Sequence, residues 1–191
     1  MSWNQELLLW VNAFVGRYPI LDAVAQLLVN EYFVPVALAL GLLFLWFGGR
    51  GPERDSWQWA TVVAAVSVGA TNALIAISNR LYPAPRPFTQ LDLDLLFYKP
   101  SDPSFPSNAA GLGFAIAGGV WLRHKRASIP FFVLAILFPV VRVFSGVHYP
   151  LDVIAGAVLG FATALLTDKA LRRAEPIVAR LLAALRRLGV A

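Results

Sequence analysis

The sequence predicts an all-α protein, a polytopic transmembrane bundle of about six helices with two site-bearing loops on one face. Two features of its composition support this class. Hydrophobic residues make up 58% of the 191 residues and charged residues only 14%, whereas soluble domains carry about 45–50% apolar and about 25% charged residues. The mean hydropathy is +0.65, and the apolar residues occur in long continuous runs, which is typical of helices that face lipid.

The apolar runs define the expected membrane helices in order. Residues 4–30 are only moderately apolar and are interrupted by charged residues and a proline, so we expect two short helices there. The further runs lie at 33–47, 57–77, 109–122, 129–141 and 153–166. About 20 apolar residues are needed to cross the hydrocarbon core, and 33–47 reaches that length only if it begins near Leu28. We therefore expect five crossings and a sixth from the N-terminal segment.

Basic residues cluster in three of the segments that connect or follow these runs. They occupy the loop 50–56, the turn 123–126 and the tail from Lys169 onward. Because cytoplasmic segments of membrane proteins carry an excess of Lys and Arg, we expect these three on the cytoplasmic side. The loops 79–108 and 142–150 then face the opposite side of the membrane.

The basic tail mixes arginines with leucines. This pattern fits either an amphipathic helix on anionic lipid or a solvated basic end. The formal net charge of +5 does not indicate a nucleic-acid partner, because the cations lie at membrane edges without a soluble domain to present them. The chain has no cysteine, which excludes disulfides and thiolate metal sites.

The last apolar run contains a Gly-x-x-x-Gly pair, Gly156 and Gly160. Pairs of this kind let two membrane helices approach closely. We expect these glycines to pack against a neighbouring helix of the bundle.

The first of the two opposite-side loops combines prolines with candidate anion ligands. Residues 79–88 read Asn-Arg-Leu-Tyr-Pro-Ala-Pro-Arg-Pro-Phe, and the three prolines oppose a helix and stiffen the chain around Arg86. Ser107 directly precedes the next apolar run and suits a helix N-cap. The free N–H groups of a helix N-terminus favour an anion as their partner.

The second loop carries a candidate nucleophile. His148 and Asp152 are four residues apart, so one helical turn places them on the same face. A carboxylate that accepts the imidazole N–H fixes the tautomer and activates the other nitrogen, and the fork of Arg142 matches a phosphoryl group. The residues alone thus predict a phosphate pocket, although arginines at membrane ends also snorkel to headgroups and a His–Asp pair can be structural.

Three short motifs follow one another in the order and spacing of a known family. They are Arg86-Pro87, then Pro106-Ser107, then Arg142-x5-His148-x3-Asp152. Together they resemble the motifs of the type 2 phosphatidic acid phosphatase superfamily, and the strings Pro-Arg-Pro-Phe and Ser-Phe-Pro-Ser are most similar to its bacterial undecaprenyl-diphosphate phosphatase branch. The resemblance implies a single membrane-embedded lipid phosphatase domain over 1–191, in a bacterial inner membrane, with the site loops on the periplasmic or extracellular side.

The resemblance also implies roles for individual residues. His148 would be the nucleophile that forms a phosphohistidine, and Asp152 would orient it. The implied ligands of the phosphoryl oxygens are Arg86, Ser107, Asn108 and Arg142, with Asn79 and Arg80 at the first-motif lysine position. No metal and no other cofactor is implied, because fixed cations and N–H groups spread the charge of the transition state.

The sequence departs from the family pattern at three positions. Asn79 stands where the family has lysine, and the neighbouring Arg80 supplies a charge one residue out of step. Val141 stands where the family often has serine. Ala109 occupies the position of the general-acid histidine, and because alanine cannot donate a proton we expect impaired activity, from an engineered His→Ala change or a natural variant.

The leading interpretation is a phosphatase that converts undecaprenyl diphosphate to the monophosphate. Phosphatidylglycerophosphate, phosphatidate and lipid A phosphate are alternative substrates. A non-catalytic membrane protein that binds lipid phosphate through the surviving arginines is an alternative of a different class. A transporter is less favoured, because the apolar runs lack acidic coupling residues and half-repeat symmetry. The sequence carries no indication of an oligomeric state.

Overall fold

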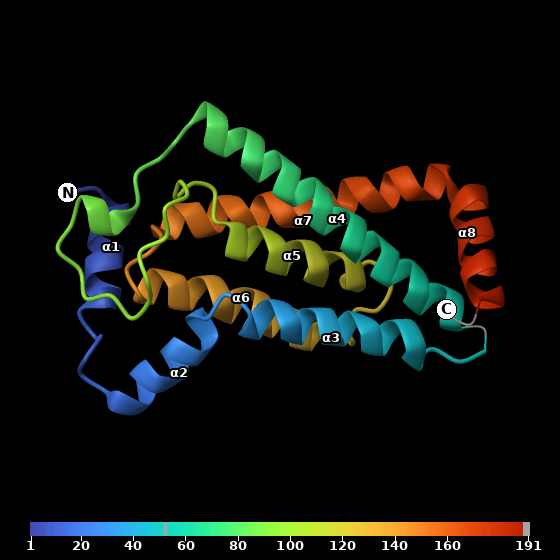
Figure 1. Ribbon diagram of the computed structural model, residues 1–191, viewed down its shortest axis with the longest axis horizontal. Helices are drawn as coiled ribbons and strands as arrows, with labels where there is room; N and C mark the ends of the chain where they lie inside the picture. The colour runs from blue at the N-terminus through green and yellow to red at the C-terminus, as the bar shows by residue number, and fades with distance from the viewer. Residues whose placement is uncertain (52, 189–191) are drawn as a thin grey trace.

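The computed structural model describes residues 1–51 and 53–188, and every regular element in these segments is helical. The elements, shown in Figure 1, are α1 (Trp3–Asn12), α2 (Pro19–Val29), α3 (Phe33–Gly48), α4 (Glu53–Leu81), the short 3₁₀ helix η1 (Pro87–Thr89), α5 (Asn108–Trp121), α6 (Ile129–Phe144), α7 (Pro150–Arg173) and α8 (Glu175–Arg187). The predicted all-α class is confirmed, and so are the two short helices expected within 4–30.

Helix α5 forms the centre of the bundle. It packs against α7, α4 and α6, and most of its residues are buried (Figure 1). Its sequence, NAAGLGFAIAGGVW, is dominated by glycine and alanine, which allow the neighbouring helices to approach closely. The wide contact surface of α5 therefore follows from its lack of large side chains.

The contact between α5 and α7 is made backbone to backbone through the Gly-x-x-x-Gly pair. A methyl group added to Gly160 would overlap the carbonyl oxygen of Gly111, and one added to Gly156 would overlap the carbonyl oxygen of Ser107. The expected packing of this pair against a neighbouring helix is thus confirmed. Glycine is required at both positions because the obstructing atoms belong to the main chain.

The outer surface of the bundle is apolar, as a lipid-facing surface must be. Side chains such as Phe44 on α3 and Val158 on α7 are 75% and 65% exposed. Two helices, α4 and α7, are long and apolar enough to span a membrane, and the pair α2 and α3, bent by 59°, counts as a third candidate. The expected count of six is not confirmed, since α5 and α6, at 14 and 16 residues, extend only about 21–24 Å.

Two helices continue further than the sequence predicted. Asn79 and Arg80 lie in the last turn of α4 and Arg142 lies in the last turn of α6, so the prediction that loops begin at these residues was wrong. Helix α4 ends only before the proline-rich segment that starts at Pro83, and prolines end helices by removing a donor and by steric overlap. Helix α6 ends just before Gly146, which has a φ of +75°.

The two site-bearing loops share one end of the bundle. Residues 82–107 and 145–149 lie beside α1 at the left of Figure 1, whereas the basic turn 123–126 and α8 lie at the opposite end. The prediction of two loops on one face is confirmed. The segregation of the basic segments from these loops agrees with the pattern from which the membrane orientation was predicted.

The basic tail forms the amphipathic helix α8, which crosses the end of α4. Val178 and Leu182 are buried against Trp59, and Arg186 forms an ion pair with Asp55. One apolar face of α8 therefore packs against the rest of the protein. Other apolar residues of α8, Ile177, Leu181 and Leu188, remain exposed.

The glycine contact between α5 and α7 can be tested by a matched pair of substitutions. Gly160→Ala should lower the stability of the bundle by about 1–3 kcal/mol, because overpacking displaces backbone. Gly69→Ala in α4 is the control, since a methyl group there meets nothing within 4 Å and the substitution improves helix propensity by about 1 kcal/mol. Thermal unfolding in detergent should show a lower midpoint for Gly160→Ala only. Equal midpoints would contradict the backbone contact.

Candidate active site

A cavity of about 300 Å³ lies at the loop end of the bundle. Its lining combines charged and apolar residues from several elements: Glu31, Pro35, Arg86, Pro100, Asp102, Asn108, Ala109, Leu112, Phe138, Arg142 and His148. Five residues singled out in the sequence therefore lie around one cavity, although up to 62 positions separate them in the chain. They are Arg86, Asn108, Ala109, Arg142 and His148. The walls carry two guanidinium groups, from Arg86 and Arg142, and two carboxylates, from Glu31 and Asp102.

Arg86 is held rigidly in the wall of this cavity. Its Nε donates to the carbonyl oxygen of Asp102 at 2.8 Å, its Nη2 pairs with the Asp102 carboxylate at 2.9 Å, and its Nη1 donates to the carbonyl oxygen of Val147 at 2.8 Å. Only 5% of the residue is exposed. The guanidinium is thus preorganised, so that little side-chain entropy is lost when it binds a ligand.

His148 is held in place through both ring nitrogens, and one of them carries no proton. Its Nδ1 lies 3.0 Å from the carbonyl oxygen of Ser104. A carbonyl can only accept, so Nδ1 carries the proton and Nε2 presents its lone pair. The Nε2 atom lies 3.4 Å from Nη1 of Arg86, at the cavity that both residues line.

The sequence predicts that the Asp152 carboxylate accepts the imidazole N–H of His148, but the two groups lie too far apart for a hydrogen bond. Its Oδ2 lies 3.6 Å from Nδ1 of His148, whereas it accepts hydrogen bonds from the Ser104 hydroxyl and, at 2.8 Å, from the N–H of Tyr149. The carboxylate therefore orders the loop around the histidine. Ser104 bridges the two, because its carbonyl accepts from His148 while its hydroxyl donates to Asp152.

Arg142 is the second cation of the cavity. Its guanidinium carbon lies 4.9 Å from the ring centroids of both Phe97 and Phe138, and Nη2 donates to the carbonyl oxygen of Val29 at 3.5 Å. Its Nε is buried and has no hydrogen-bond partner among the described residues. A buried donor left in this state costs about 1–3 kcal/mol, which an anion in the cavity would offset.

The burial of His148 affects its protonation. Removal from water lowers the pKa of His148 below its ordinary value, and the positive charge of Arg86 lowers it further. The nearby carboxylate of Asp152 opposes this shift and is outweighed. The imidazole is therefore neutral near pH 7, as a nucleophilic nitrogen must be.

The N-terminus of α5 contributes to the wall of the cavity. Ser107 is the N-cap, as predicted, and its hydroxyl accepts from the N–H of Ala110 at 3.5 Å. Ser107 itself is buried and lies outside the cavity lining, whereas Asn108 and Ala109 belong to it. The methyl group of Ala109 thus stands where a longer side chain would enter the cavity.

The sequence matches the PAP2 superfamily over residues 59–175, a segment that contains all of the motif residues. The chain belongs to the PAP2 superfamily. Among its relatives are a protein named bacitracin transport permease protein BcrC from Bacillus licheniformis, 34% identical over 85% of this chain and 77% of the relative, and one named undecaprenyl-diphosphatase BcrC from Bacillus subtilis, 28% identical over 82% and 78%.

Solved structures of this superfamily share the same fold. The crystal structure of Aquifex aeolicus LpxE superposes with a TM-score of 0.68 at 26% identity and covers 88% of this chain and 96% of that one. A PAP2-type phosphatidylglycerolphosphate phosphatase from Bacillus subtilis has a TM-score of 0.63 at 22% identity over 89% and 85%. The chain is therefore a bacterial membrane protein of the PAP2 phosphatase family, a family of hydrolases.

Three of the predicted PAP2 ligands lie outside the cavity lining: Ser107, as described above, and Asn79 and Arg80. Asn79 and Arg80 belong to the last turn of α4 and are absent from the lining. Arg80 is exposed, and the buried side-chain oxygen of Asn79 has no hydrogen-bond partner among the described residues. Asn79 and Arg80 do not belong to the loop because helix α4 extends past residue 77, where the apolar run was expected to end.

Three polar residues of this PAP2 site were not predicted from the sequence. Asp102 pairs with Arg86, Ser104 accepts from His148, and Glu31 lines the cavity while it accepts from the hydroxyl of Tyr98. Acidic side chains are not expected beside a phosphate. Only Ser104 had a detectable signal, since it lies two residues before Pro106 of the second motif.

The protonation state of His148 can be measured directly. Because burial lowers its pKa, the imidazole should titrate below about pH 6.5, the ordinary value. Asp152→Asn should move the midpoint further down, since the carboxylate favours the protonated ring. Imidazole ¹⁵N spectra of the labelled protein in detergent, assigned with His124→Ala, provide the measurement. A midpoint above pH 6.5 would contradict the neutral nucleophile.

Proposed function

We propose that this chain is an undecaprenyl-diphosphate phosphatase that works through a phosphohistidine at His148. The observation that carries the proposal is the unprotonated Nε2 of His148, which lies beside Arg86 in a cavity also lined by Arg142. In this proposal residues 1–191 form one domain in the bacterial inner membrane. The cavity end faces the periplasmic or extracellular side, as the distribution of basic residues predicts.

The first step transfers the terminal phosphoryl group to the protein. Nε2 of His148 attacks the terminal phosphorus, an N–P bond forms, and the bond to the bridging oxygen breaks, so that the lipid monophosphate leaves with the electron pair. The carbonyl of Ser104 holds the Nδ1 proton throughout. Arg86 and Arg142 stabilise the charge on the phosphoryl oxygens.

The second step regenerates the histidine. A water molecule attacks the phosphorus, the N–P bond breaks, and inorganic phosphate leaves with the oxygen and the protons of that water. Asp152 keeps the loop ordered through Ser104 and Tyr149 during both steps. The residues required for this cycle all belong to this chain.

Ala109 determines which lipid phosphates can be substrates. An alkoxide leaving group needs a proton, and general acid catalysis contributes typically 10²–10⁴-fold. Alanine cannot supply it, so phosphomonoesters such as phosphatidate, phosphatidylglycerophosphate and lipid A phosphate should be poor substrates. A diphosphate expels a lipid phosphate, which is a far weaker base. The relatives named as undecaprenyl-diphosphatases support the same choice.

The second candidate is a membrane protein that binds lipid phosphate without turnover. Ala109 favours it, because the cavity keeps Arg86 and Arg142 while residue 109 in its lining carries only a methyl group. The two candidates predict the same ligand. They differ in whether a covalent phosphate forms on His148.

Phosphate release from undecaprenyl diphosphate in detergent tests the proposal. The parent chain should release phosphate, Ala109→His should release it faster, and His148→Ala should abolish release in both backgrounds. Retention of covalent phosphate on His148 after a rapid acid-free quench should accompany turnover. Binding of the lipid without release by the parent or by Ala109→His would favour the binding protein instead.

A comparison of leaving groups tests the role of Ala109. The parent should hydrolyse undecaprenyl diphosphate in clear preference to phosphatidate. Ala109→His should raise the phosphatidate rate by about 10²–10⁴-fold, the usual contribution of a general acid, and the diphosphate rate by less. Equal rates on both lipids by the parent chain would contradict this account. The matched control is Ala109→Gln, which adds a side chain of similar length at the same position but has no titratable proton to donate.

A further inference from the structure

Helix α8, at the end of the bundle opposite the cavity, has an apolar sector of which only one part packs on the protein. Val178 and Leu182 are buried against the bundle, whereas Ile177, Leu181 and Leu188 are 69%, 60% and 74% exposed. With 3.6 residues per turn, spacings of four and seven place these three residues on one stripe beside the buried pair. We call this stripe the α8 free face. Apolar side chains gathered in this way on a surface are typical of a binding face.

Exposed arginines border the α8 free face along its length. Arg180 and Arg187 are seven residues apart, and each directly precedes a leucine of the face, so the two form a parallel stripe. Both are exposed. Unlike Arg186, which pairs with Asp55, they form no ion pair with any residue that the structure describes. A row of unpaired cations beside a row of apolar side chains matches a layer of anionic head groups above acyl chains.

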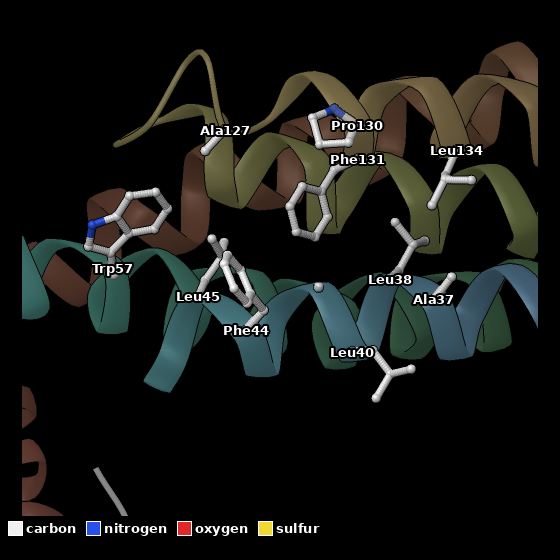
Figure 2. A pocket seen from close by; sticks show the side chains of 11 residues that line it. Ala37, Leu38, Leu40, Phe44, Leu45, Trp57, Ala127, Pro130, Phe131 and Leu134 are labelled. Atoms are coloured by element: carbon white, nitrogen blue, oxygen red, sulfur yellow. The ribbon is translucent and has the colours of Figure 1, made fainter. Parts of the chain in front are cut away.

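Tryptophans surround the place where α8 docks. Four of the six lie at this end of the bundle: Trp46, Trp57, Trp59 and Trp121. Figure 2 shows Trp57 of α4 near Ala127, which precedes α6. The cluster that buries Val178 contains Trp59, and Trp46 packs against it. Because tryptophan rings concentrate at the level of the lipid head groups, these contacts place α8 at that level.

The basic turn supports the same depth. The guanidinium carbon of Arg123 lies 5.1 Å from the ring centroid of Trp59, and Nζ of Lys125 lies 5.5 Å from that of Trp121. Cations above a layer of tryptophans are the arrangement expected where a membrane protein leaves the hydrocarbon core. Helix α8 therefore lies where apolar groups and phosphates are both within reach.

The direction of α8 leaves the α8 free face open to the side of the bundle. The helix runs across the end of the bundle rather than along it (Figure 1). Arg180 is two residues from both Val178 and Leu182, and positions two apart lie on nearly opposite sides of a helix. The arginine stripe thus points away from the bundle. The α8 free face lies between this stripe and the docked side, so it points sideways, toward the lipid that surrounds the bundle.

We propose that the α8 free face and its arginine stripe bind the surface of an anionic phospholipid leaflet. Ile177, Leu181 and Leu188 enter the acyl region beside the bundle, and Arg180 and Arg187 pair with lipid phosphates. A second copy of the chain fits this surface less well, because the two basic stripes would repel each other. The surface lies at the end of the bundle opposite His148, so the inference is independent of the proposed function.

Fluorescence quenching of the full chain in lipid nanodiscs tests the proposal. Because the chain has no cysteine, Leu181→Cys and Ala183→Cys each supply a single attachment site for a fluorophore. Ala183 is exposed and two residues from Leu181, hence on the other side of the helix. Phospholipids with a nitroxide on the acyl chain should quench the fluorophore at 181 more strongly. Iodide in the water should quench the fluorophore at 183 more strongly.

The charge of the quenching lipid makes the test specific. Nitroxide-labelled phosphatidylglycerol should quench the fluorophore at 181 more strongly than labelled phosphatidylcholine. Each arginine near an anionic surface strengthens binding about fivefold, so Arg180→Gln combined with Arg187→Gln should remove most of this preference. The matched control, Arg17→Gln combined with Lys99→Gln, removes the same charge from the loop end and should leave the preference unchanged.

Three outcomes would overturn the assignment. Strong iodide quenching at both positions would show that the α8 free face lies in water. Equal quenching by the two lipids in the parent background would contradict recognition of anionic lipid. Disulfide-linked dimers of unlabelled Leu181→Cys, together with a fluorophore at 181 shielded from both quenchers, would assign the face to a second copy. None of these measurements requires turnover, so a failure of the proposed function would not alter them.

Discussion

The backbone contact between α5 and α7 is the constraint on which the site depends. Gly156 of α7 lies against the carbonyl of Ser107, and the N–H of Ser107 donates to the carbonyl of Asp152 at 2.9 Å. The N-termini of two helices are thereby joined at one end of the bundle. Ser104 and His148 lie in the loops that lead into α5 and α7. The hydrogen bond between these two residues therefore depends on the contact between α5 and α7, although neither residue belongs to a helix.

Two buried guanidinium groups impose the main electrostatic cost at this end of the molecule. Arg86 is compensated by Asp102 and by two backbone carbonyls, whereas Arg142 is held by aromatic rings and keeps an unpaired Nε. Partnerless donors in a low-dielectric site interact strongly with an incoming anion. Because its Nε lacks a partner, Arg142 is the cation whose hydrogen bonding improves more when a phosphate binds. Arg86 is already paired and keeps a fixed position beside His148.

A lipid phosphatase must hold a charged head and an apolar tail within a few ångströms of each other. In this bundle α5 and α6 carry a polar residue only at the loop end, Asn108 and Arg142, and α3 is apolar throughout. Charges at membrane depth are expensive and are confined to functional positions. The sharp change along these helices thus keeps the charged residues at the end of the bundle where the cavity lies.

The sequence by itself determined the helical membrane class, the family, and the residues Arg86, Arg142 and His148, because apolar runs and short motif spacings are local properties of the chain. Only the tertiary structure decided which carbonyl orients His148, that Asp102 pairs with Arg86, and that Asn79 and Arg80 stay outside the cavity. The bond between Ser104 and His148 joins residues 44 positions apart. Contacts of that range are set by how closely glycine-lined helices approach, which no local pattern in the sequence specifies.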